Sequence, residues 1–445
     1  MVKIQRSNEE INSIGGISLI GILLNSLESL KKVNDMQMKN IKKGNIKHSG
    51  ILKCLAGLFA LGKNEYADIE LFRKDDFFRD SLKLKAVPSE STLRQRADEL
   101  AMVEGVFKHI KDSALELLKM VSSFGTEKVA SGEYIPLDID VSPFDNSGSN
   151  KEGVSWTYKN HDGYAPIFAY LGNEGYLLNC ELRPGSQHSN KGALEFIRET
   201  LDMIEALGIN LENILIRLDS AHDDADIIEE VTRRGARMII KRNLRKEFKE
   251  WWLASARRVG TCVTPREGKN VFTGELSHIY PSGREDLAPI FATFEVIERT
   301  IDKHGQELLI ADIEVNTFWT NLPDASETVI RLYHNHGTSE QFHSELKSDL
   351  GVERLASGKF STNALLLQLA MLSFNCLRII GQSALKMSKL LPRKFKVVRR
   401  RLKSVMQDLI YIACKRVWHA GSIILKLGKS SPWFEVFRQL HIKFS

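Results

Sequence analysis

The sequence has little proline, glycine or cysteine for its length. Eleven prolines and 30 glycines among 445 residues exclude a collagen-like or low-complexity chain. The five cysteines exclude a disulfide scaffold, and because none of them forms a C-x-x-C pair they argue against a structural zinc site. Hydrophobic residues make up 43% and charged residues 27%, a balance that is typical of a folded globular protein with reduced thiols.

Long apolar runs are also scarce. The apolar stretch 14–24 follows Glu9 and Glu10, and no cleavage site of small residues comes after it, so we expect no signal peptide. The run 364–380 has 17 residues and contains polar side chains such as Asn375 and Arg378. A membrane span needs about 20 apolar residues, so this run predicts a buried helix and no membrane partner.

The net charge of +6 is unevenly distributed. Residues 386–445 contain 15 Lys and Arg but two acids, whereas residues 1–385 contain 47 bases and 54 acids. A basic tail on a mildly acidic body indicates a polyanionic partner, although a solvated basic face is an equal alternative on charge alone.

Residues 1–130 have the spacing of amphipathic helices and form the first predicted domain. Ser89 or Ser91 can cap a helix there, and Glu90 suits the positive end of its dipole. The next helical face carries Arg94 and Arg96, which could lie on DNA or belong to a plain surface helix.

From residue 131 the pattern changes to strands. Alternating residues at 134–141 predict a strand, and 164–171 and 175–182 read as two more strands joined by the turn at 172–175. Three consecutive strands with short connections predict an antiparallel meander. A helix at 191–207, a strand at 213–218, a helix at 224–234 and a strand at 237–241 follow. The predicted order over 131–245 is therefore β-β-β-α-β-α-β.

Three further segments complete the predicted organisation. Residues 246–325 read as a mostly β insertion, and residues 326–385 as helices that complete the core. Residues 386–445 are basic and predicted helical, with Arg399, Arg400 and Arg401 in the densest stretch.

Four acids stand out by position. Asp138 and Asp140 lie two apart within the first strand and so point to the same face of the sheet. Asp219 ends the fourth strand, where ligand sites gather in parallel sheets, and Glu340 opens a helix. Three such carboxylates can hold two Mg²⁺ ions about 3.5–4 Å apart, which suits phosphodiester chemistry.

This order of acids on strand, strand end and late helix resembles the ribonuclease H-like layout. Three stretches make the resemblance specific: DIDVSPFDNSGSNKEG at 138–153, YKNHDGYAPIFAYLGNEGYLLNCELRPG at 158–185, and RLDSAH at 217–222. Together with 333–347 they are similar to bacterial insertion-sequence transposases of the DDE class, in the group-1 DDE domain family. The resemblance covers roughly residues 15–440.

The resemblance also implies roles for residues 333–347. Related transposases carry the pattern Y-x2-R-x3-E-x6-K, which Tyr333, Glu340 and Lys347 match. His336 stands where the pattern has arginine, and without the bidentate guanidinium it is a weaker phosphate ligand. The resemblance implies that Tyr333, His336 and Lys347 contact DNA.

The first acid of the family precedes a Ser or Thr by two residues. Asp140 with Ser142 matches this spacing, so we favour Asp140 over Asp138 as the ligand. His222 and His188 lie beside the predicted site as candidate supporting or DNA contacts, with a structural role as the alternative.

The resemblance implies a transposase that binds the terminal inverted repeats of its element, cuts the DNA and joins the 3′-hydroxyl ends to a target. Asp140, Asp219 and Glu340 would hold two Mg²⁺ ions, with Mn²⁺ as a possible substitute. The implied partners are double-stranded DNA and a second copy of the chain on DNA, in a bacterial cytoplasm and at the nucleoid when bound. The alternatives are a ribonuclease H-like nuclease without strand transfer and a catalytically silent DNA-binding repressor.

The β insertion helps to order DNA in related transposases. Trp251, Trp252 and Trp319 of this chain could stack on a flipped base there, and core packing is the alternative for at least two of them.

Overall fold

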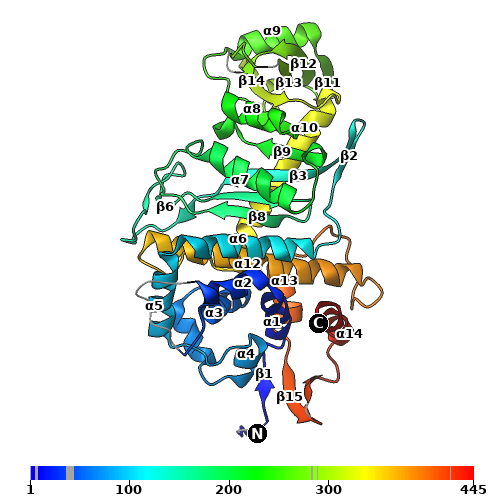
Figure 1. Cartoon of the computed structure of the whole chain (residues 1–445). Helices are drawn as coiled ribbons and strands as arrows, with labels where there is room; N and C mark the ends of the chain where they lie inside the picture. The colour runs from blue at the N-terminus through cyan, green and yellow to red at the C-terminus, as the bar shows by residue number, and fades with distance from the viewer. Residues whose placement is uncertain (1, 6–8, 37–44, 282–283, 288, 421) are drawn as a thin grey trace.

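The computed structural model describes residues 2–5, 9–36, 45–281, 284–287, 289–420 and 422–445. The N-terminal part is helical, as predicted (Figure 1). Ser89 caps the fifth helix by accepting a hydrogen bond from the Thr92 backbone N–H at 3.2 Å. The helices are α1 (Ile17–Ser26), α2 (Glu28–Lys32), α3 (His48–Ala60), α4 (Asp76–Ser81), α5 (Glu90–Ala101) and α6 (Glu104–Lys119).

A mixed sheet forms the centre of the molecule, in the predicted β-β-β-α-β-α-β order. β3, β7 and β8 form the antiparallel meander, while β9 and β10 join it in parallel to β3. Nearly every side chain of β7, β8 and β9 is buried, so both faces of these strands are covered. The elements are β3 (Gly132–Val141), β7 (Ile167–Leu171), β8 (Tyr176–Glu181), α7 (Ala193–Ala206), β9 (Ile214–Leu218), α8 (Ala225–Arg233) and β10 (Arg237–Lys241).

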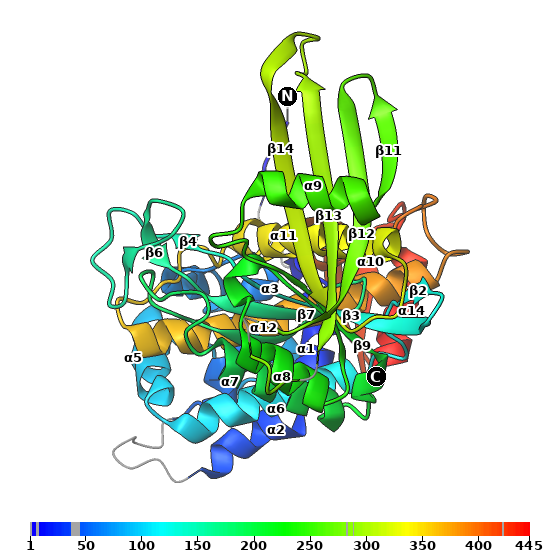
Figure 2. The ribbon, with the colours of Figure 1, turned by 90° about the horizontal axis from the view of Figure 1, so that it is seen from above.

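A small three-stranded sheet lies beside the end of β3. It pairs β4 (Phe144–Asp145) and β5 (Ser155–Trp156) with β6 (Asp162–Tyr164) between them. Two residues separate β4 from β3, so this small sheet projects from the carboxyl end of β3 (Figures 1 and 2).

The insertion is mostly β, as predicted, and it extends the central sheet. Its strand β14 pairs with β10 antiparallel, so the combined sheet has ten strands, β2 included. The long strands β13 and β14 project from the body in Figure 2. The elements of the insertion are α9 (Lys249–Val259), β11 (Thr261–Arg266), β12 (Lys269–Ile279), β13 (Ile290–Ile301) and β14 (Glu307–Thr320). The strand β2 (Glu127–Val129) precedes the core and pairs with β3.

The helices after the insertion are α10 (Ser326–His334), α11 (Thr338–Ser344) and α12 (Phe360–Lys386), with a π-helical turn at Glu345–Asp349. α12 runs between the sheet and the N-terminal helices, where it contacts β8, α3, α5 and α6 (Figure 1). It contains the predicted buried helix 364–380 and is apolar and long enough to cross a membrane, but 94% of its apolar window is buried in the protein. The buried-helix prediction is confirmed.

The C-terminal tail departs from the all-helical prediction. α13 (Leu402–Val405) and α14 (Phe434–Phe444) are helices, but β15 (Cys414–His419) and β16 (Ser422–Leu427) form a hairpin. β15 also pairs with β1 (Ile11–Asn12), which lies about 400 residues earlier in the chain. The hairpin itself had a local signal in the β-branched Val417, Ile423 and Ile424, so the all-helical prediction was wrong there, whereas the pairing with β1 over this sequence distance leaves no local signal.

One hydrophobic core connects these parts. It runs from Ile14 in the N-terminal region through Leu369 of α12 to Leu440 of α14. The predicted domain boundaries at 130, 245, 325 and 385 stay predictions. The helix α12 packs against the central sheet on one side and against the N-terminal helices on the other.

Candidate active site

Asp138 forms a buried ion pair and is not open to a ligand. Arg217 binds it through Nε to Oδ1 at 2.6 Å and through Nη2 to Oδ2 at 2.7 Å. Only 2% of the Asp138 side chain and 1% of the Arg217 side chain are exposed. Burial acts to raise the pKa of Asp138, but Arg217 and His336 outweigh it and hold that pKa below its usual value. Asp138 therefore joins strands β3 and β9.

Asp140 lies two residues further along β3, on the same face, and is accessible. Its side chain is 22% exposed, and Oδ1 accepts a hydrogen bond from the Val141 backbone N–H at 2.7 Å. His343 Nε2 lies 3.3 Å from Oδ2. Burial acts to raise the pKa of Asp140, but the His343 hydrogen bond and the charges of His343 and His336 lower it, which favours the carboxylate that a metal needs.

Asp219 follows the last residue of β9, as predicted. Its Oδ1 accepts a hydrogen bond from the Ala221 backbone N–H at 3.1 Å, and His222 Nδ1 lies 2.7 Å away. His222 is fully buried, whereas 41% of the Asp219 side chain is exposed. The histidine thus orients a carboxylate that faces solvent, which agrees with a supporting role for His222.

Glu340 is the third residue of α11 and is exposed. It lines a cavity of about 600 Å³ together with Asp140, Tyr158, His343 and Lys347. Among the described residues none donates a hydrogen bond to the Glu340 carboxylate, so it can turn toward a ligand. The fold thus brings Asp140 and Glu340, 200 positions apart in the sequence, to one cavity.

The carboxylates of Asp140 and Asp219 both act on two tyrosines, Tyr158 and Tyr333. Burial and the nearby carboxylates of both acids raise the pKa of Tyr158, and burial with Asp219, Asp140 and Asp138 raises that of Tyr333. Asp219 does not line the cavity that Asp140 and Glu340 share, but it follows β9, the strand adjacent to β3. Tyr333 is half-buried, packs on Phe318 and His336, and does not line this cavity either.

The donors suit a hard divalent cation, because Asp140, Asp219 and Glu340 offer only oxygen. In the described part of the chain, no three His, Cys, Asp or Glu side chains are already close enough together to hold a metal ion. The exposed Glu340 side chain can rotate, and this rotation would bring its carboxylate to a cation bound by the two aspartates. The chemistry of the donors therefore fits, with Asp138 excluded from the set by Arg217.

The other residues of the 333–347 pattern have internal partners. His336 is buried, and its Nδ1 lies 2.8 Å from Asp138 Oδ1, so it has little surface left for a phosphate. Burial acts to lower the pKa of His336, but Asp138 outweighs it and raises that pKa. Lys347 donates to the Pro143 carbonyl at 2.6 Å, and burial lowers its pKa. Lys347 nevertheless lines the cavity that holds Glu340.

The arginines that were predicted to bind DNA are mostly engaged within the protein. Arg96 and Arg400 are buried, the former beside His48 and the latter bonded to Asp408. Arg399 bonds Glu345, and Arg401 bonds Asp349, although half of the Arg401 side chain is exposed. Arg94 is exposed. Of these five, Arg94 and Arg401 have surface to offer to DNA.

His343 is a site residue that the sequence pattern did not predict. Its Nδ1 lies 3.2 Å from the buried Tyr170 hydroxyl, and its Nε2 faces Asp140. A Tyr170 hydroxyl that donates to Nδ1 leaves the Nε2 proton for Asp140. His343 lies three residues after Glu340 on the same helix, and this spacing was the available signal.

Of the three tryptophans considered for base stacking, Trp252 and Trp319 are buried and only Trp251 is exposed. Core packing therefore accounts for two of them, as the alternative held.

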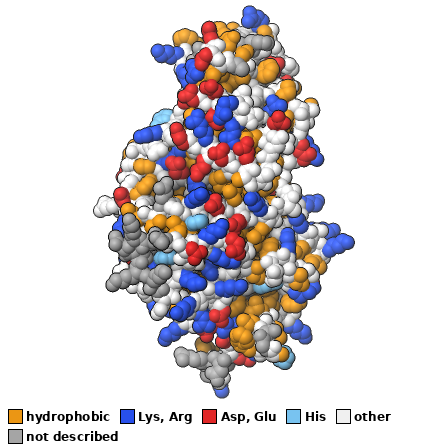
Figure 3. Space-filling model, in the orientation of Figure 1, with side chains coloured by type: hydrophobic (Ala, Val, Ile, Leu, Met, Phe, Trp, Pro, Cys, Tyr) orange, Lys and Arg blue, Asp and Glu red, His pale blue; other side chains and the backbone are white. Residues whose placement is uncertain are grey.

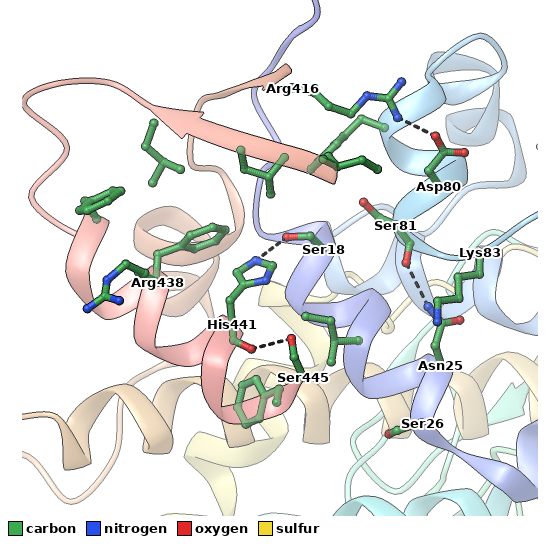
Figure 4. A pocket seen from close by; sticks show the side chains of 18 residues that line it. Ser18, Asn25, Ser26, Asp80, Ser81, Lys83, Arg416, Arg438, His441 and Ser445 are labelled. Carbon is green, nitrogen blue, oxygen red and sulfur yellow. Dashed lines mark hydrogen bonds and ion pairs between the residues drawn. The ribbon is translucent and has the colours of Figure 1, made fainter. Parts of the chain in front are cut away.

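A second groove, of about 670 Å³, lies between α1, the β15–β16 hairpin and α14 (Figure 4). His441 Nε2 lies 2.8 Å from the Ser18 hydroxyl there, and Arg416 bonds Asp80 at 2.6 Å. None of the three candidate acids lines this groove.

On the face shown in Figure 3, Lys and Arg side chains are interspersed with acids, in line with the charge balance of residues 1–385.

One acid on β3, one at the end of β9 and one on α11 form the arrangement that is expected of enzymes that transfer polynucleotide strands. The family comparison agrees. The whole chain, residues 1–445, matches the family model described as transposase DDE domain group 1, and the chain belongs to this family. A DDE transposase domain is a polynucleotidyl transferase, and enzymes of this kind use divalent metal ions.

No curated protein sequence matches the chain. Among solved structures, the chain is similar to piggyBac transposase in a synaptic complex with hairpin DNA, determined by cryo-EM. The TM-score is 0.43 at 9% sequence identity, and the alignment covers 89% of this chain and 79% of that one.

Proposed function

We propose that this protein is the transposase of a bacterial insertion sequence, with a ribonuclease H-like catalytic core. It binds the terminal inverted repeats of the element, cuts the DNA at their ends and joins the 3′-hydroxyls to a target. The observation that carries the proposal is the meeting of Asp140 and Glu340 in one cavity, with Asp219 at the end of the neighbouring strand.

Asp140, Asp219 and Glu340 are the proposed ligands of two Mg²⁺ ions, for which Mn²⁺ can substitute. When bound, such ions activate the attacking hydroxyl or water and stabilise the leaving oxygen. His343 and His222 orient the Asp140 and Asp219 carboxylates through the hydrogen bonds described above. Lys347, at the wall of the cavity, offers a positive charge for the DNA backbone once it leaves the Pro143 carbonyl.

The proposed partners are double-stranded DNA, at the element ends and at the target, and a second copy of the chain on that DNA. The N-terminal helices supply end recognition in this proposal, with the exposed Arg94 as a phosphate contact. Arg401 of the tail is the second exposed candidate. The proposed location is the bacterial cytoplasm, with the protein at the nucleoid when it is bound.

The test is cleavage of labelled DNA that carries the terminal inverted repeat, in Mg²⁺ and in EDTA, with Asp140→Asn and Glu340→Gln beside the unchanged protein. Removing one ligand should lower the rate at least a hundredfold, which corresponds to a loss of roughly 2.7 kcal/mol of transition-state stabilisation. End binding should stay within about twofold. A target plasmid in the same reaction reports joined products, which separates a transposase from a nuclease.

Asp145→Asn is the matched control. Asp145 lines the same cavity, but its Oδ1 accepts from the Ser147 backbone N–H at 2.9 Å in a local turn. We expect this variant to cut at the normal rate. Metal-independent cutting, or full activity of Glu340→Gln, would refute the proposed site, and tight end binding without any cutting would indicate a repressor.

A further inference from the structure

The segment 155–162, at the edge of the catalytic cavity, has no role in the chemistry described so far. It forms the hairpin between β5 and β6 in the small sheet beside the end of β3 (Figures 1 and 2). It exposes two large aromatic side chains, Trp156 at 60% and Tyr158 at 55%. Thr157 between them is buried, so the two aromatic residues lie on the outer side of the hairpin.

The hairpin tip is held in one conformation. The Thr157 backbone N–H and hydroxyl both contact the His161 carbonyl at 2.9 Å, and the Asn160 N–H donates to the Thr157 carbonyl at 3.1 Å. Asn160 has a φ of 61°, the left-handed conformation that asparagine tolerates better than most residues. These contacts hold the loop before a ligand binds, which reduces the entropy cost of binding.

The Tyr158 ring is fixed at the mouth of the cavity. Its hydroxyl donates to the Val141 carbonyl, one residue after Asp140, at 2.8 Å. Tyr158 lines the same cavity as Asp140 and Glu340. A ring that is anchored by its hydroxyl and exposed over more than half of its surface presents a flat apolar face beside the carboxylates.

Positive charge accompanies this ring. Lys159 is exposed, and its amine lies 5.5 Å from the centroid of the Tyr158 ring. Lys347 lines the same cavity. Aromatic faces with adjacent cations are the combination by which proteins bind single-stranded nucleic acid, because bases stack on the rings while the cations meet phosphates.

We propose that Tyr158 and Lys159 form a subsite for one unpaired nucleotide of the DNA strand next to the bond that is cut. The base stacks on the Tyr158 ring, and the adjoining phosphate contacts the Lys159 amine. Trp156 extends the apolar face away from the cavity. This subsite deepens the proposed function and rests on it for the identity of the strand.

The first test is equilibrium binding without catalysis. The probe is a duplex of the terminal inverted repeat whose last nucleotide is an unpaired 2-aminopurine, in Ca²⁺ so that binding is measured without cutting. Stacking should quench the probe in the unchanged protein. Tyr158→Leu should abolish the quenching and weaken binding about 5- to 140-fold, the range that loss of one base–aromatic stack produces. Tyr158→Phe keeps the ring and should retain the quenching.

The second test separates stacking from a folding defect. Lys159→Met, at an exposed position, should reduce the slope of log affinity against log salt by about 0.7, as expected for one lost phosphate contact on a single strand. A probe with an abasic site in place of 2-aminopurine should bind Tyr158→Leu and the unchanged protein equally. Melting temperatures of both variants serve as the fold control.

The outcomes distinguish this inference from the proposed function. If the unchanged protein cuts the element end but Tyr158→Leu binds and quenches normally, the subsite is wrong and the transposase proposal stands. If nothing is cut yet quenching depends on Tyr158, the subsite stands and the catalytic proposal fails. If Tyr158→Leu loses affinity equally for the 2-aminopurine probe and for the abasic probe, the loss does not depend on the base, and the stacking proposal is refuted.

Discussion

Replacing Arg217 by methionine tests whether the buried pair with Asp138 aligns the two strands that carry the catalytic acids. In the register of β3 and β9, Asp138 faces Arg217, and each lies two residues before a candidate ligand, Asp140 or Asp219. Arg217 Nη1 also donates to the Leu332 carbonyl of α10 at 2.9 Å. The arginine thus connects three elements of the site.

The expected loss follows from burial. Both side chains of the pair are almost fully buried, so water cannot replace the lost partner. Removing one member of such a pair costs about 3–5 kcal/mol, because the other charge remains buried without compensation. His336 offsets part of this cost at 2.8 Å from Asp138, so we expect the lower end of the range.

Urea unfolding followed by tryptophan fluorescence and circular dichroism measures the change. Arg217→Met should lower the free energy of unfolding by about 3 kcal/mol. Adding Asp138→Leu to Arg217→Met should recover at least half of the loss, since no charge then remains buried. A loss below about 1 kcal/mol in Arg217→Met would show that the pair does not hold β3 to β9.

Other predictions concern pH and the tail. Asp138 raises the pKa of His336 above its unfolded value. The stability that the His336–Asp138 pair contributes is therefore complete below about pH 6.5 and is lost as the pH rises through the folded pKa of His336. A His336→Gln protein whose stability still falls over this pH range would contradict the prediction. Arg399 bonds Glu345 and donates to Gln341 at 2.9 Å, next to Glu340, so Arg399→Met should lower kcat for cleavage several-fold with little change in KM. Arg400→Met should lower the melting temperature but not the salt dependence of DNA binding, since this arginine is buried on Asp408; a reduced salt slope would restore it as a DNA contact.

The local pattern of the sequence was sufficient for the central sheet. Alternation predicted β3, and short strand-like runs bounded by turns predicted β7, β8, β9 and β10, because both signals arise within a few residues. The placement of Asp219 directly after β9 followed from the same reasoning. The charge pattern indicated a basic run at Arg399, Arg400 and Arg401, but it could not show that each of them has an acidic partner within the protein. Their contact with DNA stays a prediction.

Asp138 and Asp140 show what the sequence alone determined and what it could not. Their two-residue spacing places both on one face of a strand, and it leaves open which of them is free. The tertiary structure decides, because Arg217 on the parallel strand β9 neutralises Asp138 and leaves Asp140 at the cavity. The same holds for Tyr158, whose place beside Asp140 depends on a hairpin that folds back onto the end of β3. Periodicity specifies elements, whereas contacts between distant elements decide which side chains are buried, paired or free.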